Sequence, residues 1–485
     1  MALGLPVVPI EQSQTRYAGR LLTHLQRVQP PVRTLGVAVL LGWLTDLLFY
    51  GKPLGISVPV FILLLAGTLV AVGHLEGLRP ARRNLWLLAP LLFFATMVCV
   101  RANATLTWLN LAAVASLLGL LVFFYAADRI ERLGLMGYPA VVLLAGRQTV
   151  SRPVPLALAA SRGMAARRDH MRALAPLVRG IALALPILLV FTVLLSSADT
   201  FFAQYVSDAL QFGYLSDLPE VLWRLLLIMA ATWLIAGGLL YATSRRRFWP
   251  RADAETVLPG HLEPARRLGF VEAATVLALV DLLFAVFAWT QFAYLFSGHA
   301  AATMHFESFR LYARRGFGEL LVASVLTLCL ILGLRWIASR KTVREVYVLN
   351  GLSTLMVGLV AVMLVSAFQR LLVWEHVEYY INTPIRLYVR WFIIWLGLTF
   401  GWLVFTLWLR ADRFAIGGFV AALGFLVTVN LLNPDADVAK YNLARQDELS
   451  TRFLHLLSDD AVPSLVAGLE AAPAAVQLPL REHLR

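Results

Sequence analysis

The sequence predicts an all-α fold: a polytopic bundle of about eleven transmembrane helices. Three observations lead to this class. Apolar stretches of roughly twenty residues recur along the whole chain, charged residues are scarce, and the arginines gather in alternate connectors. A hydrocarbon core about 30 Å thick takes about 20 helical residues to cross. Backbone groups in lipid must be paired within the protein, which favours helices.

Composition supports the membrane class and excludes others. Hydrophobic residues make up 59% of the chain and charged residues 15%, whereas soluble domains carry about 25% charged residues. The net charge of +13 comes from short connectors between apolar spans, not from one soluble basic face, so we expect no nucleic-acid partner. Cys99 and Cys329 both lie within apolar spans, which predicts no disulfide framework and no CxxC metal site.

Window length and hydropathy give the individual spans. In chain order they are residues 34–50, 56–73, 85–100, 106–126, 177–198, 221–241, 271–297, 317–337, 349–373, 385–409 and 414–432. The first and third are the shortest. An even number of spans would break the pattern in which alternate connectors are basic.

The arginines of alternate connectors predict the orientation. The basic set comprises segments 1–33, 74–84, 127–176, 242–270, 338–348 and 410–413, whereas segment 199–220 has four acidic residues and no Lys or Arg. Cytoplasmic loops carry the excess of Lys and Arg, so the N-terminus is expected inside and the C-terminus outside.

This layout divides the chain into five parts. They are a cytoplasmic segment 1–33, a four-span bundle 34–126, a basic cytoplasmic connector 127–176, a seven-span core 177–432 and an extracytoplasmic helical tail 433–485. The connector contains short apolar runs, which favour an interfacial helix on the inner surface; a docking site for a cytoplasmic protein is the alternative. In the tail, apolar residues recur at helical spacing and Pro463 suits a first helical turn.

Three separated motifs carry a family resemblance. They are HFESFRLYARRGFGELLVAS from residue 305, SAFQRLLVWEHVEYYINTPIRLYVRWFIIW from residue 366, and NPDADVAKYNLAR with LSDDAVPSL in the tail. Together they resemble a bacterial family of polytopic membrane proteins known only as a domain of unknown function. The resemblance covers about residues 177–469 and implies a helical bundle in the bacterial inner membrane. It implies no activity, substrate or cofactor.

Asp281 is the deepest ionisable residue of the predicted spans, about ten residues from the inner end of its helix. A charged side chain at the bilayer centre costs at least about 2.5–3.5 kcal/mol on insertion scales, so such residues are functional candidates. Asp281 is therefore a candidate proton or cation site, or a carboxyl group that is kept neutral or hydrogen-bonded to a neighbouring helix. The resembling family usually has an amide there, which weakens the case for an essential charge. Asp46 lies nearer the predicted surface.

A larger polar group is predicted just below the outer surface, where several spans reach one depth. Its members are Arg370, Glu375, Glu378, Arg386 and Arg390 around the loop between the ninth and tenth spans, with Glu319 and Arg224 from two others. Arg386 and Arg390 share a helix face. Guanidinium groups match carboxylate or phosphate oxygens, which suggests a site for an anion or lipid headgroup. The alternative is a set of internal ion pairs, such as that of Glu220 with Arg224.

These residues leave three functions open. The chain has no Walker, Rossmann, GxSxG or HExxH motif, and we expect no cofactor and no metal. The preferred interpretation is a transport-type or anion-binding membrane protein. A non-catalytic scaffold or signalling subunit with membrane or cytoplasmic protein partners is the first alternative. An enzyme on a lipid-linked substrate, with Glu375 or Glu378 as base, is the second. The lipid bilayer is a partner in all three.

Overall fold

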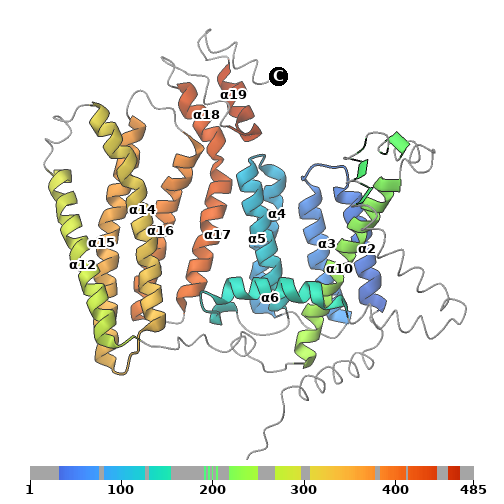
Figure 1. Ribbon diagram of the computed structural model, residues 1–485, viewed down its shortest axis with the longest axis horizontal. Coiled ribbons are helices and arrows are strands. Elements are labelled where there is room, and N and C mark those ends of the chain that lie inside the picture. The colour runs from blue at the N-terminus through green and yellow to red at the C-terminus, as the bar shows by residue number, and fades with distance from the viewer. Residues whose placement is uncertain are drawn as a thin grey trace, which may run out of the picture. The chain divides into compact units, whose positions relative to one another are not determined.

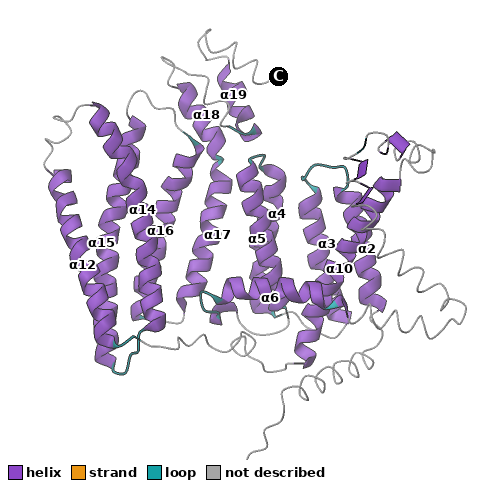
Figure 2. Ribbon diagram, viewed as in Figure 1, coloured by secondary structure: helices purple, strands orange, loops and turns teal. Residues whose placement is uncertain are grey.

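The computed structural model describes most of the helical part of the chain. The described residues are 32–75, 81–125, 130–154, 218–248, 268–296, 306–376, 383–410, 413–444 and 457–469, with a few positions between 191 and 205. Their regular structure is helical (Figure 2), and the one bridge outside helices pairs Leu268 with Ala338. The predicted segment 1–33 and the predicted span 177–198 lie almost entirely outside these residues.

The described helices follow one another in chain order. Their bounds are α2 (Val32–Phe49), α3 (Ser57–Leu75), η1 (Arg82–Leu87), α4 (Leu88–Val100), α5 (Ala104–Phe123), η2 (Ile130–Arg132), α6 (Gly137–Ser151), α10 (Leu218–Phe248), α12 (Phe270–Phe296), α14 (Phe306–Ile337), α15 (Val343–His376), α16 (Pro384–Trp408), α17 (Phe414–Leu432), α18 (Pro434–Ala444), η5 (Asp459–Ala461) and α19 (Val462–Leu469).

Among the described residues, nine helices are long and apolar enough to cross a bilayer. They lie in α3, η1 with α4, α5, α10, α12, α14, α15, α16 and α17, and each coincides with a predicted span. The apolar part of α2, Thr34–Phe49, is shorter. The prediction of a helical multi-pass membrane protein is thus confirmed, whereas the total of about eleven spans stays a prediction.

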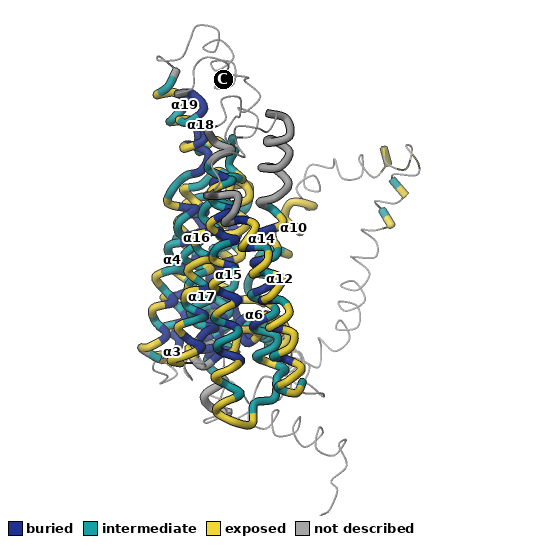
Figure 3. The backbone as a smooth tube through the Cα atoms, turned by 90° about the vertical axis from the view of Figure 1, so that its left-hand side faces the viewer, coloured by how far each residue is buried: buried dark blue, intermediate teal, exposed yellow. Residues whose placement is uncertain are grey.

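Large apolar side chains on the outside of these helices fit a lipid environment. Trp289, Trp108 and Leu282 are 78%, 72% and 63% exposed, and exposed segments run along the length of the helices (Figure 3). A soluble monomer rarely exposes continuous apolar surface on this scale. The same surface costs nothing against lipid tails, which are as apolar as leucine.

The chain forms two compact units. Unit 1 comprises residues 1–53, 64–79 and 145–244, and unit 2 comprises residues 54–63, 80–144 and 245–485. In unit 2, α15 packs against α12, α14 and α16; α16 packs against α17, and α17 reaches the α4–α5 hairpin (Figure 1). The buried centre of this row includes Leu277 of α12, Met356 and Val360 of α15, and Leu403 of α16.

The first part of α6 lies crosswise to the spans of unit 2 (Figure 1). It is held by Tyr138, whose ring stacks on Phe419 of α17 with centroids 4.8 Å apart. Tyr138 and Val141 are buried, whereas Met136 and Leu143 are 75% and 74% exposed. This arrangement is that expected for an interfacial helix.

In unit 1, α2 and α10 touch through small residues. A Cβ atom at Gly42 of α2 would lie 2.0 Å from Oγ1 of Thr232 on α10. Five residues further along α10, a Cβ atom at Gly237 would meet the carbonyl oxygen of Thr149 at 1.7 Å, and Trp233 donates its Nε1–H to the carbonyl of Val150 at 2.9 Å. Close approach over small residues is the common way to pack helices in lipid.

The α16–α17 interface places indole rings over glycines. Trp395 and Trp402 of α16 cover Gly424 and Gly417 of α17, where an added Cβ atom would lie 2.1 and 1.8 Å from the nearest ring atom. Trp395 also donates its Nε1–H to Thr428 at 3.1 Å. The indoles therefore fill the space that a larger residue would need.

We expect Gly417→Ala to destabilise unit 2 by about 1–3 kcal/mol, the usual cost of overpacking a core. Gly418→Ala is the matched control, because a Cβ atom there meets nothing nearer than Phe414 at 4.0 Å. Thermal unfolding of both variants in detergent, followed by tryptophan fluorescence, measures the difference. Equal stability of the two variants would contradict this packing.

Candidate functional site: polar layers at the tail end of unit 2

Arg370 is anchored inside unit 2 near the last turns of α15. We call the end at which α17 meets α18 the tail end of unit 2. Ser366 and Arg370 lie one turn apart on one face of α15, and both donate to Oε1 of Gln291 on α12 at 2.9 Å. Gln291 and Ser366 are 6% and 3% exposed. The amide oxygen of Gln291 thus fixes the position of the guanidinium group.

Arg390 of α16 lies at nearly the same height as Arg370. The helices α15 and α16 are antiparallel, since Asn350 donates to the carbonyl of Leu407 and Trp408 donates to Thr354. Counting from the Thr354–Trp408 contact at 1.5 Å per residue, the two arginines differ by only about 3 Å in height. Arg386 lies one turn nearer the tail end, and all three side chains are half-buried. We call these three residues the arginine layer.

Asp281 lies deeper on the same helix as Gln291. Its side chain is 3% exposed, and neither carboxylate oxygen has a hydrogen-bond partner among the residues that the structure describes. The ten residues that separate it from Gln291 correspond to about 15 Å along α12. Buried polar groups are almost always paired, and an orphan calls for an explanation. The alternative prediction, a carboxyl group bonded to a neighbouring helix, finds no such bond in the described part of the chain.

The other predicted site residues are spread over the chain. Glu319 is exposed on α14. The side chain of Glu375 and the whole of Glu378 lie outside the described residues. Arg224 belongs to α10 of unit 1.

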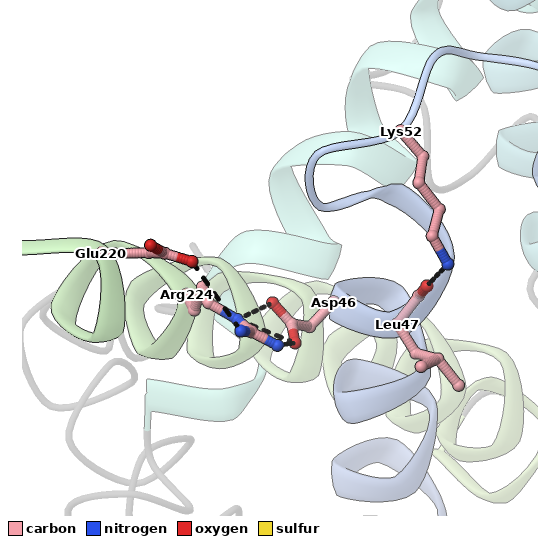
Figure 4. A network of polar contacts seen from close by, with 5 residues as sticks. All are labelled: Asp46, Leu47, Lys52, Glu220 and Arg224. Carbon is pink, nitrogen blue, oxygen red and sulfur yellow. Dashed lines mark hydrogen bonds and ion pairs between the residues drawn. The ribbon is translucent and has the colours of Figure 1, made fainter. Parts of the chain in front are cut away.

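In unit 1, Arg224 pairs with Asp46 (Figure 4). Arg224 donates Nε–H to Oδ1 of Asp46 at 3.1 Å and Nη2–H to Oδ2 at 2.7 Å. Asp46 is 5% exposed and Arg224 is 45% exposed. The predicted Glu220 contact is longer, at 4.0 Å, and the guanidinium also lies over the Tyr50 ring, 5.0 Å from its centroid. Sequence reasoning missed Asp46 as the main partner, because nothing local links α2 to α10.

A second polar layer, also missed, joins the tail to the α4–α5 loop. Asp460 accepts the backbone N–H groups of Ala102 and Asn103 at 3.0 and 3.2 Å. Asp435, which is 1% exposed, accepts from the Asn103 amide at 2.9 Å and from the Ser458 hydroxyl. We call this set the tail clamp: Asn103, Asp435, Ser458 and Asp460.

Local backbone geometry positions the tail clamp. Asn433 ends α17 in the left-handed region, with φ 48°, a conformation that Asn adopts more readily than most residues. Its side chain donates to the carbonyl of Asp460 at 3.1 Å, and Pro434 then begins α18. The helix α18 therefore follows α17 directly and contacts α16 and α19.

Below the clamp, α17 is fixed to the α4–α5 hairpin. The side-chain amides of Asn110 and Asn430, both 0% exposed, exchange hydrogen bonds of 2.9 and 2.8 Å. Arg101 donates its Nε–H to the carbonyl of Asn430 at 2.8 Å. The NPDAD and LSDDA motifs were the available sequence signal for the clamp, although their partner, Asn103, is more than 300 residues away.

Tyr388 of α16 links the arginine layer to the tail clamp. It lies between Arg386 and Arg390 and is within electrostatic reach of Asp435, Asp460 and Arg101. Among the described residues, its buried hydroxyl has no hydrogen-bond partner. Several helices thus bring buried polar groups to the tail end of unit 2. In the described residues, no group of three His, Cys, Asp or Glu side chains is arranged to hold a metal ion.

Fold and polar layers together define an integral, multi-pass helical membrane protein. The family model described as "Domain of unknown function (DUF4153)" matches residues 88–468. The chain belongs to this family, as the three motifs indicated. No curated protein and no solved structure matches the chain.

Proposed function

We propose that this protein is of the transport type and binds a small anion or an anionic headgroup at the arginine layer. The observation that carries the proposal is the height shared by Arg370 and Arg390, with Arg370 held by the neutral Gln291. Guanidinium forks match the oxygens of phosphate or carboxylate groups, and the hydrogen bond to Gln291 fixes the position of one of them. Asp281, which lies deeper in the same helix row, is the proposed proton or cation site.

The proposed orientation, with the arginine layer outside, is supported by the charges at the two ends of unit 2. The tail end carries the clamp acids. The opposite end, which we call the connector end, is where α14 meets α15 and α16 meets α17. Its described basic residues are Arg83, Arg335, Arg340, Lys341, Arg344, Arg410 and Arg413. The described acids at this end are Glu131, Glu272 and Glu345, so Lys and Arg are in excess there. Such an excess is typical of cytoplasmic connectors.

Contacts at the connector end also support a second span, besides α10, between Tyr125 and Leu268. The carbonyl of Tyr125 accepts the N–H of Ala81, just before η1, and the ring of Tyr138 stacks on Phe419 near the start of α17. Leu268 pairs with Ala338 at the end of α14. Tyr125 and Leu268 thus share one end of unit 2. The chain between them must cross the membrane an even number of times, and α10 is one crossing. The prediction of a second span at 177–198 meets this requirement.

The proposal is tested with a cysteine at Ser366, which touches the arginine layer through Gln291. Cys99 and Cys329, both exposed on the helices, are first replaced by alanine. Membrane vesicles are then treated with an anionic and a cationic methanethiosulfonate reagent. We expect the ratio of anionic to cationic rates to exceed that of a free thiol by about tenfold, because cationic clefts concentrate anions.

Two variants sharpen this test. Arg370→Gln should return the rate ratio to that of the free thiol. Asp281→Asn, about 15 Å deeper, should leave it unchanged. A cysteine at the exposed tail residue Lys440 reports whether the reagents reach the tail side. If Lys440→Cys reacts and Ser366→Cys does not, the arginine layer is dry and the proposal fails.

A scaffold or signalling subunit is the second candidate, and the tail clamp favours it. A tail fixed by Asp435 and Asp460 presents an ordered surface formed by α18 and α19. Such a surface suits a membrane or extracytoplasmic protein partner. An enzyme acting on a lipid-linked substrate ranks third, because its proposed base, Glu375 or Glu378, has no described contact.

A further inference from the structure

Two arginines meet at the connector end of unit 2, where α14 stops. The chain after α14 is fixed to the segment before α12: Leu268 pairs with Ala338, and Ser339 donates its N–H to the carbonyl of Leu268 at 2.9 Å. This connection turns Arg340 back over the last turn of α14. Its Nη2–H donates to the carbonyl of Arg335 at 2.9 Å.

In the described structure, both guanidinium groups have buried N–H groups without a hydrogen-bond acceptor. These groups are Nη1 of Arg335 and Nε of Arg340. The two groups also lie within electrostatic reach of each other, so like charges are held together in a partly desolvated place. Burial lowers the pKa of Arg340, yet arginine stays charged in proteins.

The nearby carboxylates do not neutralise the pair. Glu272 accepts the backbone N–H of Gly269 at 2.9 Å. Glu345 accepts the backbone N–H groups of Lys341 and Thr342 at 2.7 and 3.3 Å. Both acids therefore cap helix starts. Buried donors of this kind usually have a partner, and an unoccupied ion site is one explanation.

We propose that Arg335 and Arg340 form a binding site for a phosphate group. A phosphate offers several acceptor oxygens and a negative charge, which satisfies both orphan donors and relieves the repulsion between the guanidinium groups. Lys341, which is exposed next to Arg340, adds positive charge at its rim. Basic pockets between transmembrane helices on the cytoplasmic side bind lipid headgroups, and free phosphate has the same chemistry. The site lies at the opposite end of unit 2 from the arginine layer and is independent of it.

Thermal unfolding in nanodiscs tests the proposal. Wild type, Arg340→Gln and Arg344→Gln are each placed in neutral phosphatidylcholine, in phosphatidylcholine with phosphatidylglycerol, and in neutral lipid with millimolar inorganic phosphate. Arg344 is the matched control, because it is exposed on the same connector. We expect the anion to raise the Tm of wild type and Arg344→Gln by about 3 °C through linkage, and to leave Arg340→Gln unchanged.

The three conditions distinguish binding of a lipid headgroup, binding of free phosphate and the absence of binding. A gain with phosphatidylglycerol alone identifies a lipid headgroup, and a gain with inorganic phosphate identifies free phosphate. Because the pair repels itself, Arg340→Gln should be at least as stable as wild type in neutral lipid, which shows that the variant folds. A wild type that responds to neither anion overturns the site. So does an Arg344→Gln variant that loses as much response as Arg340→Gln.

Discussion

Replacement of Asp435 by alanine is expected to release the tail from the bundle. Asp435 is 1% exposed and accepts hydrogen bonds from Asn103 and Ser458. Without it, the half-buried Asn103 amide and Ser458 hydroxyl lose their acceptor, at about 1–3 kcal/mol for each group. A local loss on the order of 2–4 kcal/mol corresponds to roughly 30- to 700-fold more frequent opening.

Hydrogen exchange of the full chain in detergent measures this opening. Amides of α18 and the N–H groups of Ala102 and Asn103 should exchange faster, because the same opening frees them from Asp460. Asp437→Ala is the matched control, since Asp437 lies in the same first turn of α18 but is exposed. Slow exchange in Asp435→Ala, or equally fast exchange in Asp437→Ala, would show that the clamp does not hold the tail.

The second large effect is expected from reversing one charge of the Asp46–Arg224 pair. Asp46→Arg places two guanidinium groups against each other where a bidentate pair joins α2 to α10. Like charges at a contact are strongly unfavourable, and a loss of stability lowers the amount of folded protein several-fold. Arg224→Asp should have the same effect, because it opposes two carboxylates.

The double variant Asp46→Arg with Arg224→Asp should restore folded protein, since it re-forms the pair in reverse. Size-exclusion chromatography of fluorescently tagged protein measures the monodisperse fraction of each variant. Glu220→Gln serves as control, because its contact with Arg224 is 4.0 Å long and exposed. If the single variants are normal, or the double variant does not recover, the pair does not determine how α2 meets α10.

The tail clamp bears on both leading functional hypotheses. Tyr388 brings α16 within reach of the clamp acids, and α16 also carries Arg386 and Arg390. A tail that opens would therefore act on the helix that supplies two members of the arginine layer. Comparison of the Ser366→Cys reagent ratio in wild type and in Asp435→Ala links the clamp to the proposed anion site.

The sequence alone was sufficient to determine the membrane class, the helical character and nine helices that can span a bilayer. Each of these depends on about 20 consecutive residues, because the free energy of transfer into lipid is a sum over a local segment. The family motifs were equally local. Arg370 and Asp281 were identifiable as candidates for the same reason, since any ionisable residue inside an apolar stretch is conspicuous.

Only the tertiary structure decided which helices and side chains meet. The α4–α5 hairpin packs on α17, Asp46 pairs with Arg224, and Asp435 meets Asn103. In lipid, residues that face a neighbouring helix and residues that face the bilayer are equally apolar, so no polar face indicates the contact side of a span. The partners of a span are instead set by small residues and isolated polar groups. These meet across hundreds of residues, and their pairing is a property of the folded bundle.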